Sequence, residues 1–186
     1  MKDLQKMSPI EFKSCSILAS VYALRMLGMF LILPIFAIYA TNLDSNPTSL
    51  QIGLALGIYG LTQAIFQIPF GMSSDYFGRK KVIYFGLLLF IIGSLIAGYS
   101  TSIEGIILGR SIQGSGAISA VLTALLADIT REEQRTKAMA IIGASIGFTF
   151  ALSLVLSPWL NDMIGVDGIF ILMAILSFTA FLLVYF

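Results

Sequence analysis

Apolar stretches of similar length follow one another along the chain, separated by short segments that carry most of its charges. The six stretches are residues 14–40, 45–74, 82–103, 105–127, 138–161 and 168–186. A helix needs roughly 20 residues to cross the hydrocarbon core of a bilayer, and each stretch is about that long. None alternates between apolar and polar positions, so the pattern predicts helices and not strands. We therefore expect an all-α protein with six transmembrane helices.

The composition agrees with a membrane location. Of the 186 residues, 58% are hydrophobic and 11% are charged, whereas about a quarter of the residues in a typical soluble domain are charged. The mean hydropathy is +0.94. Because there are too few charges to cover a surface that faces water, we expect an integral membrane protein whose first partner is the lipid bilayer.

Charge and residue types also exclude several functions. A net charge of +1 without a clustered basic face gives no indication of nucleic-acid binding. The chain has no histidine and a single cysteine, Cys15, which argues against histidine-ligated metals and against Ser–His or Cys–His nucleophile pairs. The sequence also shows no pair of carboxylates in mid-membrane for acid–base chemistry. We expect neither an enzyme nor a metal or cofactor site.

Lysines and arginines gather at one set of connections. They occur in residues 1–13, which form the predicted cytoplasmic tail, and again in 79–81 and 131–137. The connections at 41–49, 100–104 and 162–167 contain none. By the positive-inside rule, both termini face the cytoplasm. The first apolar stretch is too long for a cleaved signal peptide, so we expect it to remain as an anchor.

Local motifs predict helix starts and helix contacts. Thr48 to Gln51, Thr101 to Glu104 and Thr130 to Glu133 each match a capping box, which would open the second, fourth and fifth helices. Three glycine pairs have the spacing that allows close helix packing. These pairs are Gly53 with Gly57, Gly105 with Gly109, and Gly143 with Gly147.

The two halves of the chain resemble each other. The motif I-G-x-x-x-G occurs at 52–57 and at 142–147, and single arginines, Arg25 and Arg110, lie within the first and fourth stretches. With the predicted orientation, the two arginines reach the middle of the membrane from opposite sides. The pattern favours a 3+3 inverted repeat over chance similarity among glycine-rich apolar segments. The predicted units are residues 14–99 and residues 100–186.

Arg25 and Arg110 are costly in lipid, at about 2.5–3.5 kcal/mol each at a helix centre. No carboxylate lies at a similar depth in the sequence, because the acidic residues are at or beyond helix ends. We expect the arginines to face a water-filled cavity, an anionic ligand, or a carboxylate supplied from elsewhere. The alternatives are a structural pair or side chains that extend to the headgroups.

Polar side chains accompany both arginines. Tyr59, Gln63 and Gln67 follow one another at four-residue spacing, and Gln113 lies one turn from Arg110. Such amides either hold helices together or line a pathway, and the sequence leaves both open. The candidate substrate and proton pathway consists of Arg25, Tyr59, Gln63, Gln67, Arg110 and Gln113.

Residues 71–81 form a charged connection between the second and third helices. Arg79 would oppose the positive end of the third helix dipole, and Asp128 would oppose the negative end of the fourth. Because both lie at the same membrane face, we expect them to pair, with Asp75 as a third member. The alternative is a basic cluster that only fixes topology against anionic lipid.

Two of these segments resemble signatures of the major facilitator superfamily. Residues 71–81 match G-x-x-x-D-x-x-G-R-K/R-x, and residues 110–116 match R-x-x-Q-G-x-G. Three further segments are similar to YajR-type bacterial inner-membrane proteins of the drug:proton antiporter group. These are residues 24–30, 57–63 and 135–140.

The resemblance implies proton-coupled efflux by alternating access, in the bacterial inner membrane. This chain would be the N-terminal six-helix half, partnered by a C-terminal six-helix half that is missing here, by protons and by an unknown small molecule. A gate at the cytoplasmic face would latch onto helix 11 of the missing half. Its residues would be Gly71, Asp75, Gly78, Arg79, Lys80 and Asp128.

One segment departs from the antiporter pattern. Residues 157–162 keep Pro158 but lack the glycines of the fifth-helix antiporter signature. The alternative function is a six-helix membrane scaffold, or a half-transporter that pairs with itself and has no independent transport activity.

Overall fold

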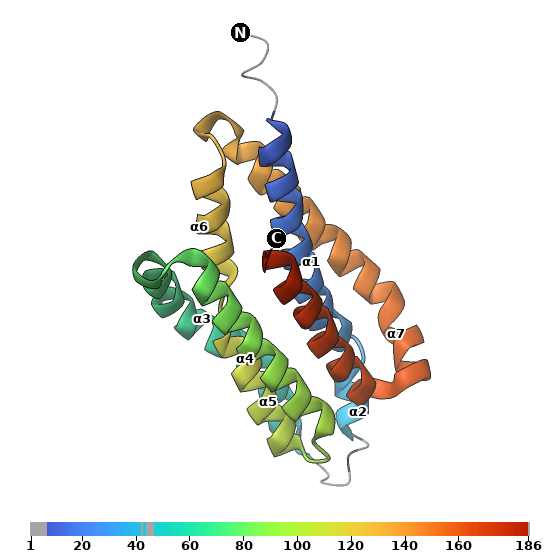
Figure 1. The fold of residues 1–186 in the computed structure, drawn as a ribbon. Coiled ribbons are helices and arrows are strands. Elements are labelled where there is room, and N and C mark those ends of the chain that lie inside the picture. Colours follow the sequence, from blue (N-terminus) through green and yellow to red (C-terminus); the bar gives the residue numbers. More distant parts are fainter. Residues whose placement is uncertain (1–6, 42, 44–46, 186) are drawn as a thin grey trace.

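The computed structural model describes residues 7–41, 43 and 47–185, and within these residues it contains helices and no strand. The helices are α1 (Pro9–Ile32), α2 (Phe36–Thr41), α3 (Ser49–Phe77), α4 (Arg79–Tyr99), α5 (Ile103–Ser115), α6 (Ser119–Ile129) and α7 (Glu132–Tyr185). They lie side by side as an elongated bundle, with the start of α1 close to the connection between α6 and α7 (Figure 1).

Six membrane crossings are formed from these helices. Five helical stretches of the described chain are long and apolar enough to span a bilayer. The longest, Glu132–Val184, has 53 residues and turns at Gly165, whose φ of 68° is not helical, so it crosses twice. α5 and α6 share one crossing, Ile103–Ile129. The prediction of an all-α protein with six transmembrane helices is confirmed.

The helix starts agree only in part with the predicted capping boxes. Thr48 caps α3 as predicted, accepting from the backbone N–H of Gln51 at 3.3 Å while Gln51 Oε1 accepts from the backbone N–H of Thr48 at 2.8 Å. The fourth-helix prediction is wrong by one residue, because Ser102 and not Thr101 caps α5. The third box does not form, since Thr130 Oγ1 has no hydrogen-bond partner.

A further capping box, which the sequence analysis missed, opens the first helix. Ser8 accepts from the backbone N–H of Glu11, and the Glu11 side chain accepts from the backbone N–H of Ser8. Pro9 occupies the first helical position, where its missing N–H costs no hydrogen bond. α1 therefore begins five residues before the predicted start at residue 14, inside the segment expected to be a tail.

The two predicted repeat units interlock. α1 packs along α7 on both sides of the Gly165 turn, as the contacts of Cys15 with Ala138 and of Gly28 with Met173 show. In the same way, α5 packs against α3 and α4. The first helix of each unit thus lies against the second and third helices of the other unit. This is the arrangement expected of a 3+3 inverted repeat.

Glycines mark where the helices approach most closely. A Cβ on Gly93 of α4 would lie 2.5 Å from the backbone oxygen of Gly109, and a Cβ on Gly109 would lie 2.6 Å from the backbone nitrogen of Ala97. Only glycine permits this contact between the α4 and α5 backbones. Of the predicted glycine pairs, Gly109 therefore packs against another helix, whereas Gly105 lies against the nearby Ser100.

The other two glycine pairs do not pack against another helix in the described part of the chain. A Cβ on Gly53, Gly57, Gly143 or Gly147 would meet nothing within 4 Å. The prediction of close packing at these pairs is wrong for the described bundle, because the faces of α3 and α7 that carry them point outward. Both copies of the I-G-x-x-x-G motif leave their glycines exposed on the surface.

Candidate functional site

Arg25 lies in the middle of α1 and is completely buried. Its Nη1 donates to Ser119 Oγ at 2.9 Å, and its Nη2 donates to the backbone oxygen of Gly116 at 2.8 Å. Gly116 lies in the break between α5 and α6. Its carbonyl oxygen accepts from the backbone N–H of Ile118 at 2.9 Å as well as from Arg25, so the break presents one oxygen to two donors. The guanidinium also lies over the ring of Phe90, 5.7 Å from its centroid.

Arg110 of α5 is 1% exposed and is held by a similar set of neutral groups. Nε donates to the backbone oxygen of Ala55 at 3.3 Å, and Nη1 donates to Gln113 Oε1 at 3.3 Å. The guanidinium lies over the ring of Tyr59, 4.9 Å from its centroid. Gln113 is itself fixed, because its Nε2 donates to Ser94 Oγ at 2.7 Å.

The two arginines are connected through their aromatic partners. The rings of Tyr59 and Phe90 meet edge to face, with centroids 6.3 Å apart and an interplanar angle of 87°. A cation over a desolvated ring gains about 2 kcal/mol. The side chains of Arg25, Phe90, Tyr59 and Arg110 therefore form one continuous row through the interior of the bundle. We call these four residues the arginine row.

The expectation of a water-filled vestibule beside each arginine is not met in this structure. Both guanidiniums are enclosed by protein, since Arg25 is 0% and Arg110 is 1% exposed, and neither lines the cavities at Phe70, Ile17 or Ile35. No carboxylate among the described residues forms an ion pair with either arginine, as the sequence indicated. The helix break at Gly116 and the neighbouring hydroxyl and amide groups supply acceptors in place of water.

Three buried polar atoms near the arginine row have no hydrogen-bond partner. They are Arg25 Nε, Tyr59 OH and Gln63 Oε1. Gln63 reaches the same hydroxyl as Arg25, because its Nε2 donates to Ser119 Oγ at 3.5 Å. A buried polar atom without a partner costs about 1–3 kcal/mol. A donor, an acceptor and a hydroxyl that are not satisfied by the protein are groups that a bound molecule can use.

The predicted stripe on α3 divides between interior and surface. Tyr59 is buried, Gln63 is half-buried and Gln67 is exposed, without a hydrogen bond to any residue that the structure describes. Residues four apart advance by about 40° around a helix, so the third member is rotated by about 80° from the first. The structure brings together five of the six predicted pathway residues and leaves Gln67 outside.

The charged connection forms the cluster that the sequence predicted. Arg79 Nε lies 3.1 Å from Asp128 Oδ2, and Arg79 Nη1 lies 2.5 Å from Asp75 Oδ1. Nη1 also donates to Ser74 Oγ at 2.6 Å. The Arg79 side chain is 23% exposed, whereas those of Asp75 and Asp128 are 66% and 54% exposed. We call Asp75, Arg79 and Asp128 the Arg79 cluster.

The remaining predicted gate residues lie around this cluster in different ways. Gly78 ends α3 and has a φ of 94°, a conformation that favours glycine. Gly71 accepts from Ser74 Oγ at 2.6 Å through its backbone oxygen, and a Cβ on it would meet nothing within 4 Å. Lys80 makes no ion pair with any described residue and lines a separate cavity with Ser14. The structure does not bring Lys80 into the cluster.

A second ion pair at the same end of the bundle was missed by the sequence analysis. Arg131, in the connection between α6 and α7, donates from Nε to Glu11 Oε1 at 2.9 Å and from Nη2 to Glu11 Oε2 at 3.0 Å. The backbone N–H of Arg131 donates to Oε1 as well, at 3.1 Å. These hydrogen bonds raise the pKa of Arg131 above its usual value. The pair ties the start of α1 to the start of α7.

Phe90, Ser94 and Ser119 are further site residues that the sequence analysis missed. Phe90 has no distinguishing signal in an apolar helix. Ser94 and Ser119 are isolated hydroxyls in apolar segments, and that pattern is a signal that would have suggested interhelical hydrogen bonds.

Nearly the whole chain resembles proteins of one family. Residues 18–186 match the family described as Major Facilitator Superfamily. The chain is 53% identical over 174 residues to the inner membrane transport protein YajR of Escherichia coli (strain K12), which covers 94% of this chain and 38% of YajR. It is 49% identical over 181 residues to an uncharacterised transporter of Buchnera aphidicola subsp. Schizaphis graminum, covering 97% of this chain and 46% of the relative.

A more distant relative has a named activity. The chain is 30% identical over 155 residues to the tetracycline resistance protein, class H, of Pasteurella multocida, covering 82% of this chain and 38% of that protein. The chain thus spans less than half the length of the curated relatives that it matches.

Solved structures share the fold at low sequence identity. The peptide transporter POT in complex with sulfate superposes with a TM-score of 0.80 at 15% identity, over 93% of this chain and 37% of POT. The inward-open xylose transporter XylE from E. coli gives a TM-score of 0.78 at 15% identity, over 94% of this chain and 47% of XylE.

Proposed function

The chain belongs to the Major Facilitator Superfamily, and on this basis we propose that it is the N-terminal half of a secondary transporter that exports a small molecule in exchange for protons. Its relatives are transporters and not enzymes. Relatives that are more than twice as long support a second half. The direction of transport and the coupling to protons are supported by the resemblance to the antiporter group and by the tetracycline resistance relative.

The arginine row is the observation that carries this proposal. Two full positive charges lie in the membrane interior, held only by neutral acceptors and ring faces. Because no carboxylate compensates them within the described chain, they favour an anionic group of a substrate or a carboxylate of the second half. The three unpartnered atoms at Arg25, Tyr59 and Gln63 are buried, so such a molecule would contact them only after the helices around the row move apart.

The gate belongs to the same proposal. In the Arg79 cluster, the Arg79 side chain is mostly enclosed, whereas both carboxylates are more than half exposed. Exposed carboxylates at the end of the bundle are available to a second half that closes over them. We assign Asp75 and Asp128 to this contact, Arg79 to their positioning, and Gly71 to a close approach, since it has open space beside it. Gln67, exposed on α3, would face the same partner.

Proteoliposomes test the assignment of Arg110. The full-length protein is reconstituted with a pH-sensitive dye inside, and proton movement is recorded on addition of tetracycline, the first probe in a panel of small molecules. Once a molecule that drives proton flux is found, Arg110→Ala should reduce that flux at least tenfold, because the arginine row loses one of its charges. Arg135→Ala is the matched control, since Arg135 is exposed and, among the described residues, its side chain pairs with Glu132 alone.

Two outcomes of this experiment would contradict parts of the proposal. Equal flux in the two variants would remove Arg110 from the pathway. Absence of proton flux with every molecule of the panel, in protein that is shown to bind one of them, would leave a transporter that is not coupled to protons.

The alternative, a scaffold or a self-pairing half, is favoured by one feature. The exposed glycine faces of α3 and α7 would accept a second copy of this chain as readily as a different six-helix unit. Cross-linking between copies tests it, as described below.

A further inference from the structure

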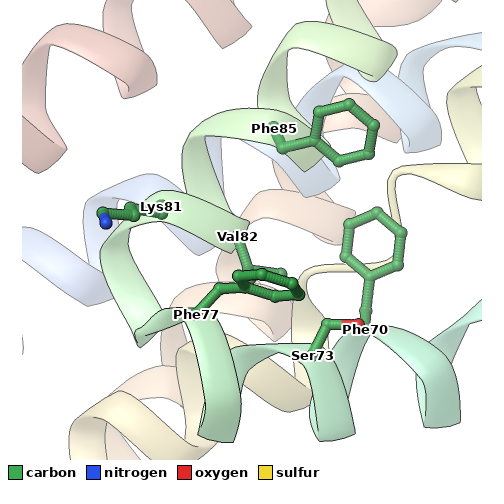
Figure 2. A pocket seen from close by; sticks show the side chains of 6 residues that line it. All are labelled: Phe70, Ser73, Phe77, Lys81, Val82 and Phe85. Atoms are coloured by element: carbon green, nitrogen blue, oxygen red, sulfur yellow. The ribbon is translucent and has the colours of Figure 1, made fainter.

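An open cleft lies between α3 and α4, at the end of the bundle that carries the basic connections. Its volume is about 350 Å³. The lining residues are Phe70, Ser73, Phe77, Lys81, Val82 and Phe85. Figure 2 shows three phenyl rings grouped on one side and the Lys81 side chain extending away from them. We call this site the α3–α4 cleft.

The aromatic wall of the cleft is open to its surroundings. Phe70 and Phe85 stack with centroids 6.0 Å apart and an interplanar angle of 23°. Phe70 and Val82 are buried at the base, whereas Phe77 is 60% exposed and Phe85 is 55% exposed. Two exposed rings above a buried apolar floor form a surface onto which a hydrocarbon chain can lie.

Lys81, at the edge of the cleft, carries a positive charge that no described residue neutralises. Arg79 is engaged by Asp75 and Asp128, but Lys81 forms neither an ion pair nor a hydrogen bond with any residue in the described part of the chain. Lys81 lies in the first turn of α4, and no side chain caps the N–H groups of that turn. Free N–H groups and the positive end of the helix dipole add to the attraction for an anion.

The cleft also faces away from the proposed partner surface. At about 100° per residue, Phe70, Ser73 and Phe77 share one side of α3, and Gly71 and Asp75 lie on average about 140° from it. A second half that docks at Gly71 and Asp75 would therefore leave the cleft open toward the bilayer.

We propose that the α3–α4 cleft is a binding site for an anionic phospholipid, with an acyl chain against the three rings and the phosphate at Lys81. The site places an apolar surface next to a cation that no described residue neutralises, at the boundary of the membrane. This arrangement is complementary to a lipid with an apolar tail and a negative headgroup. A zwitterionic lipid would find the same rings but would gain less from the lysine. One lysine at a membrane surface contributes about a fivefold preference.

A tryptophan placed in the cleft measures this preference directly. In the full-length protein, Trp159, the single tryptophan of the described chain, is replaced by phenylalanine and Phe85→Trp provides the reporter. Quenching by brominated phosphatidylglycerol is compared with quenching by brominated phosphatidylcholine in mixed vesicles. We expect phosphatidylglycerol to bind about fivefold more tightly. A reporter at Ile92, which is exposed on α4 outside the cleft, should show no preference.

Two lysine variants then separate a site from diffuse surface charge. Lys81→Gln should reduce the preference to about one, whereas Lys80→Gln, the same change at the next residue, should leave most of it because Lys80 lines a different cavity. An equal effect of both variants, or equal binding of the two lipids to the unsubstituted cleft, would overturn the proposal. Unchanged circular dichroism and gel-filtration elution establish that each variant is folded.

A second pair of variants tests the apolar wall. Phe77→Ala should weaken quenching by both lipids at the cleft, because the ring that supports the acyl chain is removed. Met72→Ala is the control, since Met72 is 69% exposed on α3 but does not line the cleft. Equal quenching in the two variants would show that no acyl chain lies on the rings and would contradict the proposal.

Discussion

Arg25 and Arg110 are charged side chains that the protein encloses without a countercharge. Each donates two hydrogen bonds to neutral acceptors and lies over an aromatic ring. The planar fork of a guanidinium can reach two acceptors and a ring face at once, which a single ammonium group cannot do. The row therefore depends on the shape of the arginine side chain as well as on its charge.

Replacing Arg25 by lysine tests this dependence. Lysine keeps the charge but cannot contact Ser119, Gly116 and the Phe90 ring together, so we expect the free energy of unfolding to fall by about 1–3 kcal/mol. Denaturation of the purified full-length protein, followed by circular dichroism, measures the change. Arg135→Lys, at a side chain that is 45% exposed, should alter stability by less than about 0.5 kcal/mol. Similar losses in the two variants would contradict the described role of the fork.

At the scale of single residues, charge placement was the informative part of the sequence. Arg79, Asp75 and Asp128 were expected to meet because Arg79 and Asp128 oppose helix dipoles at the same end, and they do meet. The partner of Glu11 could not be predicted, because that contact requires α1 to begin at Pro9 and requires the α6–α7 connection to lie beside it. Such a contact, 120 residues apart in sequence, depends on the tertiary fold.

At the scale of helices, the α4–α5 contact determines how closely the first repeat approaches the second. Gly93 and Gly109 bring the two backbones into contact, and Gln113 of α5 then reaches Ser94 of α4 at 2.7 Å. The same Gln113 accepts from Arg110. The position of Arg110 therefore depends on a helix crossing that only small residues allow.

A methyl group at Gly93 should disturb this crossing. The Cβ of Gly93→Ala would lie 2.5 Å from two backbone atoms of α5, so the helices must separate. We expect a loss of about 1–3 kcal/mol in the free energy of unfolding, measured by denaturation of the full-length protein. Ile92→Leu, on the exposed side of the same helix, should change stability by less than about 0.5 kcal/mol. A stability unaffected by Gly93→Ala would show that the two helices are not in direct backbone contact.

The six crossings could be predicted from apolar length alone, because a bilayer requires roughly 20 residues per helix wherever they pack. The break between α5 and α6 could not, since residues 105–127 read as one continuous apolar stretch. The break matters for the site, because it presents the Gly116 carbonyl to Arg25. From the sequence alone, a backbone carbonyl was not among the partners expected for that arginine, which were water, an anion or carboxylate, a structural pair, or the headgroups.

At the scale of the whole molecule, the glycine-bearing faces of α3 and α7 are surfaces that no other described helix covers. Gly57 on α3 and Gly147 on α7 occupy equivalent places in the repeated motif, and a Cβ on either would meet no other described helix within 4 Å. Small residues on an exposed helix face allow the backbone of another helix to approach closely. The two faces together are a surface for a second six-helix unit, which is either the other half of the transporter or another copy of this chain.

Cysteine cross-linking distinguishes the two partners. In a background where Cys15, the single cysteine of these 186 residues, and every cysteine of the second half are replaced by serine, Gly57→Cys is oxidised in membranes that contain the full-length protein. If the second half of the same polypeptide covers α3, Gly57→Cys should give no dimer on a non-reducing gel. Leu182→Cys, on the second part of α7 at a side chain that is 49% exposed, provides the control for dimers that form by chance collision of lipid-facing positions. A covalent dimer formed through Gly57→Cys but not through Leu182→Cys would instead establish that two copies meet at α3, because only a self-pairing face brings the same residue of both chains together.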